Sequence, residues 1–264
     1  MSNPAMSSWI VKDNNHSKED LLYLSRLAEQ TERYDDMACA MKLLTDVTAD
    51  LTNEERNLLS VAYKNVVGSR RSSYRCIESV FSAQDSSHKP AAEKYLKQVK
   101  DELSKICYEV LSILDKLSKS APAENCESLV FYHKMTGDYY RYLAEVETGD
   151  EKKSIANKSC EAYKEATKLA EIKLPCTNPI LLGLALNFSV FYFEIEENKT
   201  KACELAQNAF DKAIEELDKL AEESYKDSTL IMQLLRDNLT LWKNNSDGND
   251  EEKTEDDKKP DAKS

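Results

Sequence analysis

Hydrophobic and polar positions follow helical spacing over most of the chain. Ser17-Lys-Glu-Asp20 has the spacing of a capping box, in which the first and fourth residues satisfy each other's backbone N–H groups, with Asp in place of the usual Glu. Leu21, Leu24 and Leu27 then supply the apolar stripe of a first helix. Thr52-Asn-Glu-Glu55 repeats the capping pattern and opens a long helix that we expect to end at about residue 81. The pattern therefore predicts capped amphipathic helices.

Helical segments and short polar connections alternate along the rest of the sequence. We expect a loop at Gln84–His88, and Pro90 lies near the first turn of the following long helix, where a missing N–H is tolerated. The chain has only 5 glycines and 6 prolines, and no Asn-Gly or Asp-Gly turn joins alternating apolar runs. We predict an all-α fold of about nine antiparallel helices. The others are expected at about residues 35–47, 126–147, 151–173, 179–196, 200–222 and 227–243.

The two ends of the chain differ in composition from its middle. Residues 1–17 are polar apart from Trp9-Ile10-Val11, which predicts a flexible N-terminal extension. From Asn244 onward Asp, Glu, Lys and Gly replace all large apolar residues, which predicts a disordered acidic tail over 244–264. Residues 18–243 then form the helical domain. Since no apolar run approaches the ~18 residues of a membrane span and no signal-peptide core is present, we expect a cytoplasmic protein, with the nucleus left open.

Composition also narrows the chemistry. The net charge of −12 argues against nucleic acid as a primary partner. Seven cysteines, an odd number without a Cys-x-x-Cys pair, indicate reduced thiols rather than zinc ligands or disulfides. The three histidines lack the spacing of di-iron bundles or zinc hydrolases, and no glycine-rich phosphate loop is present. We therefore expect no metal, no cofactor and no enzymatic activity.

Strong cations nevertheless gather on one predicted helical face. Lys64, Arg71 and Arg75 follow i, i+7 and i+11 spacing, which places them within roughly 20° of a common direction. They repel one another unless nearby carboxylates or an anionic ligand compensate them, and a solvated face is the commonest explanation of such a cluster. Farther along, Asp138 is spaced to orient both Arg141 and Tyr142. Together these side chains offer donors suited to a dianionic phosphate.

Four stretches of the sequence resemble the 14-3-3 family of phosphopeptide-binding adaptors. The two longest are RNLLSVAYKNVVGSRR (Arg56–Arg71) and YKDSTLIMQLLRDNLTLW (Tyr225–Trp242). Between them lie FYHKMTGDYYRYLAEV (Phe131–Val146) and NPILLGLALNFSVFYFEI (Asn178–Ile195). The resemblance covers roughly residues 18–243 and implies a cup-shaped dimer in which each subunit has a concave amphipathic groove.

The resemblance also implies roles for individual residues. It places the phosphate of a phosphoserine or phosphothreonine peptide among Lys64, Arg71, Arg141 and Tyr142, and makes Arg75 a structural partner of acidic residues such as Asp138 or Glu145. Taken alone, the apolar stripes of the later helices would more often be core than groove. The family's contacts to the peptide backbone and side chains correspond to Asn187, Asn238, Leu186, Val190, Glu194, Leu230, Ile231, Leu234, Trp242, Val61 and Lys134.

A homodimer built from the first four helices is also implied. Leu27, Val80 and Tyr95 match interface positions of the family, and Arg33 with Glu102 matches an intersubunit ion pair. The sequence departs from the family at Thr31, Tyr74 and Cys76, and at Gln98, which would face Asp36 where a Lys is usual. A somewhat weaker dimer is therefore expected, and heterodimers with paralogues are left open.

Arg70-Arg71-Ser72-Ser73 resembles a kinase site. Phosphorylation of Ser73 is therefore a hypothesis for how the dimer is controlled, and an unmodified helical serine is at least as plausible.

These features predict a non-enzymatic adaptor that clamps, sequesters or bridges phosphorylated client proteins in signalling. The acidic tail either competes for the basic groove or only aids solubility. The alternative of a different class is a helical scaffold that binds unmodified peptides or helices. An enzyme acting on anionic substrates ranks far lower, because no acid–base or metal set is visible.

Overall fold

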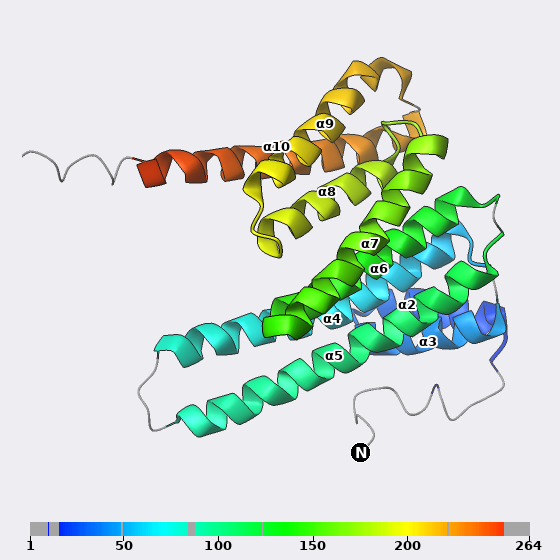
Figure 1. Ribbon diagram of the computed structural model, residues 1–264. Coiled ribbons are helices and arrows are strands. Elements are labelled where there is room, and N and C mark those ends of the chain that lie inside the picture. The colour runs from blue at the N-terminus through cyan, green and yellow to red at the C-terminus, as the bar shows by residue number, and fades with distance from the viewer. Residues whose placement is uncertain are drawn as a thin grey trace, which may run out of the picture. The chain divides into compact units, whose positions relative to one another are not determined.

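The computed structural model describes residues 10, 16–48, 50–83, 88–122, 124–220 and 222–250. Within them it contains nine α-helices, one short 3-10 helix and no strand, so the all-α prediction is confirmed (Figure 1). The chain divides into two compact units, residues 1–169 and residues 170–264. No described helix is both long and apolar enough to cross a membrane.

The first unit contains six helices, with the last residues of its final helix beyond the boundary. They are α2 (Lys18–Gln30), α3 (Tyr34–Val47), α4 (Asn53–Ala83), α5 (Lys89–Ser120), α6 (Cys126–Val146) and α7 (Gly149–Lys173). From α2 to α6 each helix packs against the next, and α4 also contacts α6. The long helices α4 and α5 lie side by side (Figure 1). Their apolar faces bury Tyr63, Leu103 and Leu114 completely, which fixes the register between α4 and its neighbours.

Both predicted capping boxes are present. The Ser17 Oγ accepts from the Asp20 N–H at 3.1 Å, and the Asp20 carboxylate accepts from the Ser17 N–H at 3.2 Å. At the start of α4, Thr52 and Glu55 exchange the corresponding bonds at 3.3 and 2.9 Å. Pro90 occupies the first turn of α5, as expected. Local sequence signals therefore determine where these helices begin.

The second unit contains three α-helices and the 3-10 helix. They are α8 (Pro179–Glu194), α9 (Lys199–Glu215), η1 (Leu217–Lys219) and α10 (Glu222–Asp250). α8 packs against both α9 and α10. Its sequence is apolar almost all round, and Leu184, Phe191 and Tyr192 lie in the core of this unit.

Three boundaries differ from expectation. The helix expected at 200–222 ends at Glu215 and is followed by η1. α10 begins before the expected residue 227 and continues through residues 244–250, where composition predicts the start of the disordered tail. Backbone hydrogen bonds of a helix require no apolar side chain, so the loss of large apolar residues does not mark a helix end. Residues 251–264 and most of the expected extension and 84–88 loop lie outside the described residues.

Candidate functional site

Three arginines from α4 and α6 converge on one carboxylate. Arg71 makes a two-pronged contact with Glu145, from Nε to Oε2 at 2.9 Å and from Nη2 to Oε1 at 2.7 Å. Arg141 Nη1 lies 3.5 Å from Glu145 Oε1, and Arg75 Nη2 lies 3.3 Å from Oε2. Arg75 is thus a partner of Glu145, as the family resemblance implied. Glu145 and the Asp138 carboxylate beside Arg141 supply two negative charges against three guanidinium groups, so the cluster retains positive charge.

Tyr142 lies between two of these arginines. The Cζ atoms of Arg71 and Arg141 lie 4.1 and 4.7 Å from its ring centroid. Burial and the nearby Asp138 carboxylate raise the pKa of its phenol, so the hydroxyl remains protonated at neutral pH. That hydroxyl has no hydrogen-bond partner among the described residues. It is therefore a neutral donor available to an anion beside Arg71 and Arg141.

Arg141 is held by a buried network that joins α6 to α7. Its Nε donates to the Tyr163 hydroxyl at 3.2 Å, and that hydroxyl donates to Asp138 Oδ1 at 2.5 Å. Asp138 Oδ1 also lies 3.5 Å from Arg141 Nη2. Burial by itself would raise the pKa of Asp138, but the charges of Lys134 and Arg141, together with hydrogen bonds from Tyr163 and Lys134, hold the pKa below its usual value. Asp138 therefore stays ionised and fixes the Arg141 guanidinium.

Tyr163 is the functional residue that sequence analysis missed. It lies on α7, and its ring packs so closely on α6 that a Cβ at Gly137 would meet it at 2.7 Å. The Ser159 hydroxyl also donates to the Gly137 carbonyl at 2.8 Å, which holds the two helices at this distance. A glycine inside a helix costs about 1 kcal/mol relative to alanine. Gly137 was thus the available signal that another element approaches α6 here.

Replacing Tyr163 by phenylalanine tests this positioning role. The variant removes the hydroxyl that bridges Asp138 and Arg141, so we expect a Tm lower by about 3–8 °C and phosphopeptide binding weaker by about three- to tenfold. Thermal unfolding followed by circular dichroism and peptide titration measure the two effects. Tyr140→Phe is the matched control, because the Tyr140 hydroxyl has no hydrogen bond within the described residues. Equal behaviour of the two variants would contradict a positioning role.

Two lysines complete the basic face. Lys64 lies two turns before Arg71 on the same face of α4, is exposed, and has no ion pair or hydrogen bond within the described part of the chain. Lys134, on α6, donates to Asp138 at 3.1 Å. The structure thus brings Arg71, Arg141 and Tyr142 into contact, whereas Lys64 shares their face of α4 without touching them. Its flexible stem leaves the ammonium mobile.

The peptide-contact residues predicted on α8 and α10 lie in the second unit. Leu186, Asn187 and Val190 on α8 are half-buried, and Glu194 at its end is exposed. On α10, Ile231 and Asn238 are half-buried. The exposed residues of α10 include three leucines within about 40° of one another around the helix, namely Leu230, Leu234 and Leu241. Their roles in peptide binding remain predictions.

Trp242 lies deeper than a surface contact residue. It is 3% exposed, and its ring stacks on Phe193 with centroids 4.8 Å apart. This stacking joins α10 to α8 within the second unit. The indole N–H is the only polar group that Trp242 could present to a ligand.

The predicted dimer residues lie on the surface of the first unit. Leu27, Val80 and Tyr95 are exposed apolar side chains. Arg33 pairs with Asp36 of its own chain at 2.5 Å, and Glu102 accepts from Gln98 at 3.0 Å. Single exposed apolar side chains are common on protein surfaces, so the interface remains a prediction.

Ser73 lies on α4, between Arg71 and Arg75. Its hydroxyl donates to the Ser69 carbonyl one turn earlier at 3.0 Å, a bond that is common for serines inside helices. Phosphorylation of Ser73 therefore remains a hypothesis.

Comparison with known proteins identifies the family. The 14-3-3 protein family model matches residues 24–243. The chain is 57% identical over 240 residues to the 14-3-3 protein zeta of Bombyx mori, covering 90% of this chain and 97% of that protein. It is 58% identical over 229 residues to the 14-3-3-like protein 2 of Caenorhabditis elegans, covering 85% and 91%. It is 56% identical over 239 residues to the 14-3-3 protein homolog 1 of Schistosoma mansoni, covering 89% and 94%. The chain therefore belongs to the 14-3-3 family.

Proposed function

We propose that the protein is a non-enzymatic adaptor that binds phosphoserine or phosphothreonine motifs of client proteins. The observation that carries the proposal is the convergence of Arg71 and Arg141 on the Glu145 carboxylate, beside a Tyr142 hydroxyl that has no hydrogen-bond partner among the described residues. One guanidinium group can donate two parallel hydrogen bonds to the oxygens of a phosphate. A phosphate also carries more negative charge than the Glu145 carboxylate that Arg71 and Arg141 both contact. Lys64 adds a fourth donor that can swing onto the bound phosphate.

The rest of the client peptide would contact α8 and α10. Extended peptides leave backbone N–H and C=O groups unpaired, and the amides of Asn187 and Asn238 can bond both kinds of group. The exposed Leu230, Leu234 and Leu241 support an apolar contribution from α10 to peptide binding.

We further propose that the protein forms a dimer through the surface that carries Leu27, Val80 and Tyr95. Two linked sites raise the apparent affinity for doubly phosphorylated clients through effective concentration.

The competing function is a helical scaffold for unmodified peptides, which the exposed leucines of α10 would also suit. Fluorescence anisotropy with one peptide sequence in phosphorylated and plain forms separates the two. The adaptor binds the phosphorylated form at least about tenfold more tightly, because each charge-assisted contact contributes about 1.5–3 kcal/mol. Equal affinity for both forms would favour the scaffold.

We propose that the protein binds its clients in the cytoplasm, with the nucleus as an alternative location.

The proposal also predicts how binding depends on pH. Because the pKa of Asp138 is lowered and that of Tyr142 is raised, neither group titrates between about pH 5 and 8. The phosphoserine loses its second proton near pH ~6. Affinity should therefore fall by about tenfold as pH decreases from ~7.5 to ~5, since the ligand becomes a monoanion.

The control for this pH dependence is a change in the ligand rather than in the protein. A difluoromethylene phosphonate peptide loses its second proton at lower pH than the phosphate ester, so its binding midpoint should move to lower pH. Titrations of both peptides across the same buffers measure the two midpoints. A midpoint that stays unchanged would assign the titration to the protein and contradict the prediction.

A further inference from the structure

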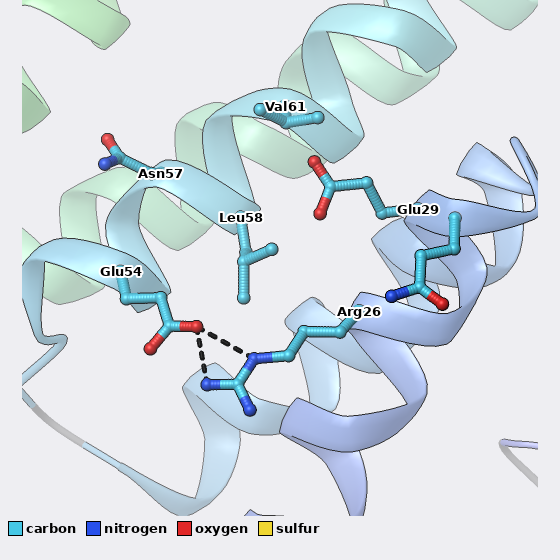
Figure 2. A pocket seen from close by; sticks show the side chains of 7 residues that line it. Arg26, Glu29, Glu54, Asn57, Leu58 and Val61 are labelled. Atoms are coloured by element: carbon cyan, nitrogen blue, oxygen red, sulfur yellow. Dashed lines mark hydrogen bonds and ion pairs between the residues drawn. The ribbon is translucent and has the colours of Figure 1, made fainter.

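A cavity of about 580 Å³ lies between α2 and α4, away from the arginine cluster. We call it the α2–α4 cavity. Its lining comes from Arg26, Glu29 and Gln30 on α2 and from Glu54, Asn57, Leu58 and Val61 on α4. Figure 2 shows the Glu29 carboxylate pointing from α2 toward α4 near Val61, apart from the contacts between Arg26 and Glu54. The volume exceeds that of one amino-acid side chain.

The charges that line the α2–α4 cavity are unevenly paired. Arg26 donates through Nε and Nη2 to one oxygen of Glu54, at 2.8 and 2.5 Å. Glu29 is half-buried, and its carboxylate has no ion pair or hydrogen bond among the described residues. The amides of Gln30 and Asn57 likewise have no partner there. One carboxylate and two amides therefore remain available above the apolar side chains of Leu58 and Val61.

This lining has the chemistry of a site for a basic side chain. The aliphatic stem of an arginine or lysine can lie on Leu58 and Val61 while its charged head reaches Glu29. The amide oxygens of Gln30 and Asn57 can accept its remaining N–H groups. An anionic group would instead meet the uncompensated Glu29, and a purely apolar group would leave the carboxylate desolvated. The charges thus select a cation.

The α2–α4 cavity also lies on the same strip of α4 as the basic face. Val61 and Lys64 are one turn apart, and Asn57, Val61, Lys64 and Arg71 fall within about 80° around the helix. Along the axis, Val61 lies about 15 Å and Leu58 about 20 Å from Arg71. An extended peptide advances about 3.3 Å per residue, so about five or six residues cover this distance. A peptide whose phosphate meets Arg71 can therefore reach the cavity.

We propose that the α2–α4 cavity binds an arginine or lysine side chain of the same phosphorylated client, about five or six residues from the phosphate. This inference rests on the proposed function, because the phosphate sets the register of the peptide. It adds a specificity element to the client motif: a basic residue at one spacing is preferred over a neutral or acidic one. Glu29 is the residue that recognises its charge.

The test uses phosphoserine peptides that carry Arg, Ala or Glu at four to seven residues from the phosphate, on either side. Fluorescence anisotropy with the full chain at physiological salt measures their affinities. We expect one spacing at which the Arg peptide binds roughly two- to fivefold more tightly than the Ala peptide, the range of a partly exposed ion pair. In Glu29→Gln this preference disappears while the affinity of the Ala peptide is unchanged.

Glu19→Gln is the matched control, because Glu19 is an exposed carboxylate on the same helix and does not line the cavity. It removes the same charge and should retain the preference for Arg. If no spacing shows a preference, or if Glu29→Gln and Glu19→Gln reduce it equally, the inference is wrong. The proposed function is tested separately by comparing the phosphorylated and unphosphorylated forms of the Ala peptide. Equal affinity for these two forms would contradict the proposed function, and this result does not depend on the Glu29→Gln variant.

Discussion

Replacing Arg71 by alanine is expected to weaken binding of a phosphoserine peptide by about ten- to a hundredfold, the largest effect on binding predicted here. Arg71 is half-buried, and its guanidinium is held in a fixed plane by the two contacts with Glu145 and by the ring of Tyr142. A side chain oriented in this way loses little entropy on meeting a phosphate. Isothermal titration with one phosphopeptide measures the loss.

Arg75→Ala is the matched control for that prediction. Arg75 lies one turn farther along the same face of α4 and also contacts Glu145, but it is more than half exposed and touches it through a single 3.3 Å contact. We expect its removal to cost less than about threefold. Equal losses in the two variants would mean that only the summed positive charge matters. A loss below threefold in Arg71→Ala would remove Arg71 from the phosphate site.

Replacing Asp138 by alanine is expected to produce the largest loss of stability. The variant removes one of the two carboxylates that lie 3.5 Å from Arg141, which is 5% exposed. It also removes the acceptor of both Tyr163 and Lys134. Breaking a buried ion pair costs about 3–5 kcal/mol, which in a chain of this size lowers the Tm by about 6–15 °C. Differential scanning calorimetry measures the shift.

The control is an exposed ion pair on α5. Asp101→Ala breaks the contact with Lys97 at 2.7 Å, in which both side chains are more than half exposed. Such a pair contributes about 0–1 kcal/mol, so the Tm should move by less than about 4 °C.

The stability that Asp138 contributes also depends on pH. Because the pKa of Asp138 is lowered in the folded state, this contribution is present above about pH 4 and is lost as pH falls through the folded-state pKa. The gap between wild type and Asp138→Ala should therefore remain constant from about pH 8 to 5.

The fold was predictable from sequence because its signals are local. The caps at Ser17 and Thr52 depend on residues three apart, and Pro90 restricts only its own turn. Helix ends were less predictable. α9 stops at Glu215 with no glycine or proline beside its end, and α10 continues through Gly248 to Asp250, where composition changes before the helix ends. Propensity alone is too weak to decide such ends.

The candidate site was predictable only in part. Spacing on one helix placed Lys64 and Arg71 on a common face of α4, and the family resemblance joined them to Arg141 and Tyr142. The network around Tyr163 was not predicted, because it depends on how α7 packs against Gly137 of α6. The pairing of Arg71 and Arg75 with Glu145 also depends on the packing of α4 against α6, whereas Arg141 lies four residues from Glu145 on the same helix. Helical periodicity carries no information about such contacts between helices.

The central claim is that the basic face of α4 and α6 recognises the phosphate itself. Its most direct test measures the affinity ratio between phosphorylated and plain forms of one peptide, in the wild type and in a Lys64→Ala/Arg71→Ala double variant, whose substitutions lie at an exposed and a half-buried position. We predict that the ratio falls from at least about tenfold to near one, while the plain peptide binds both proteins equally. A ratio that survives in the double variant would contradict the assignment of phosphate recognition to this face.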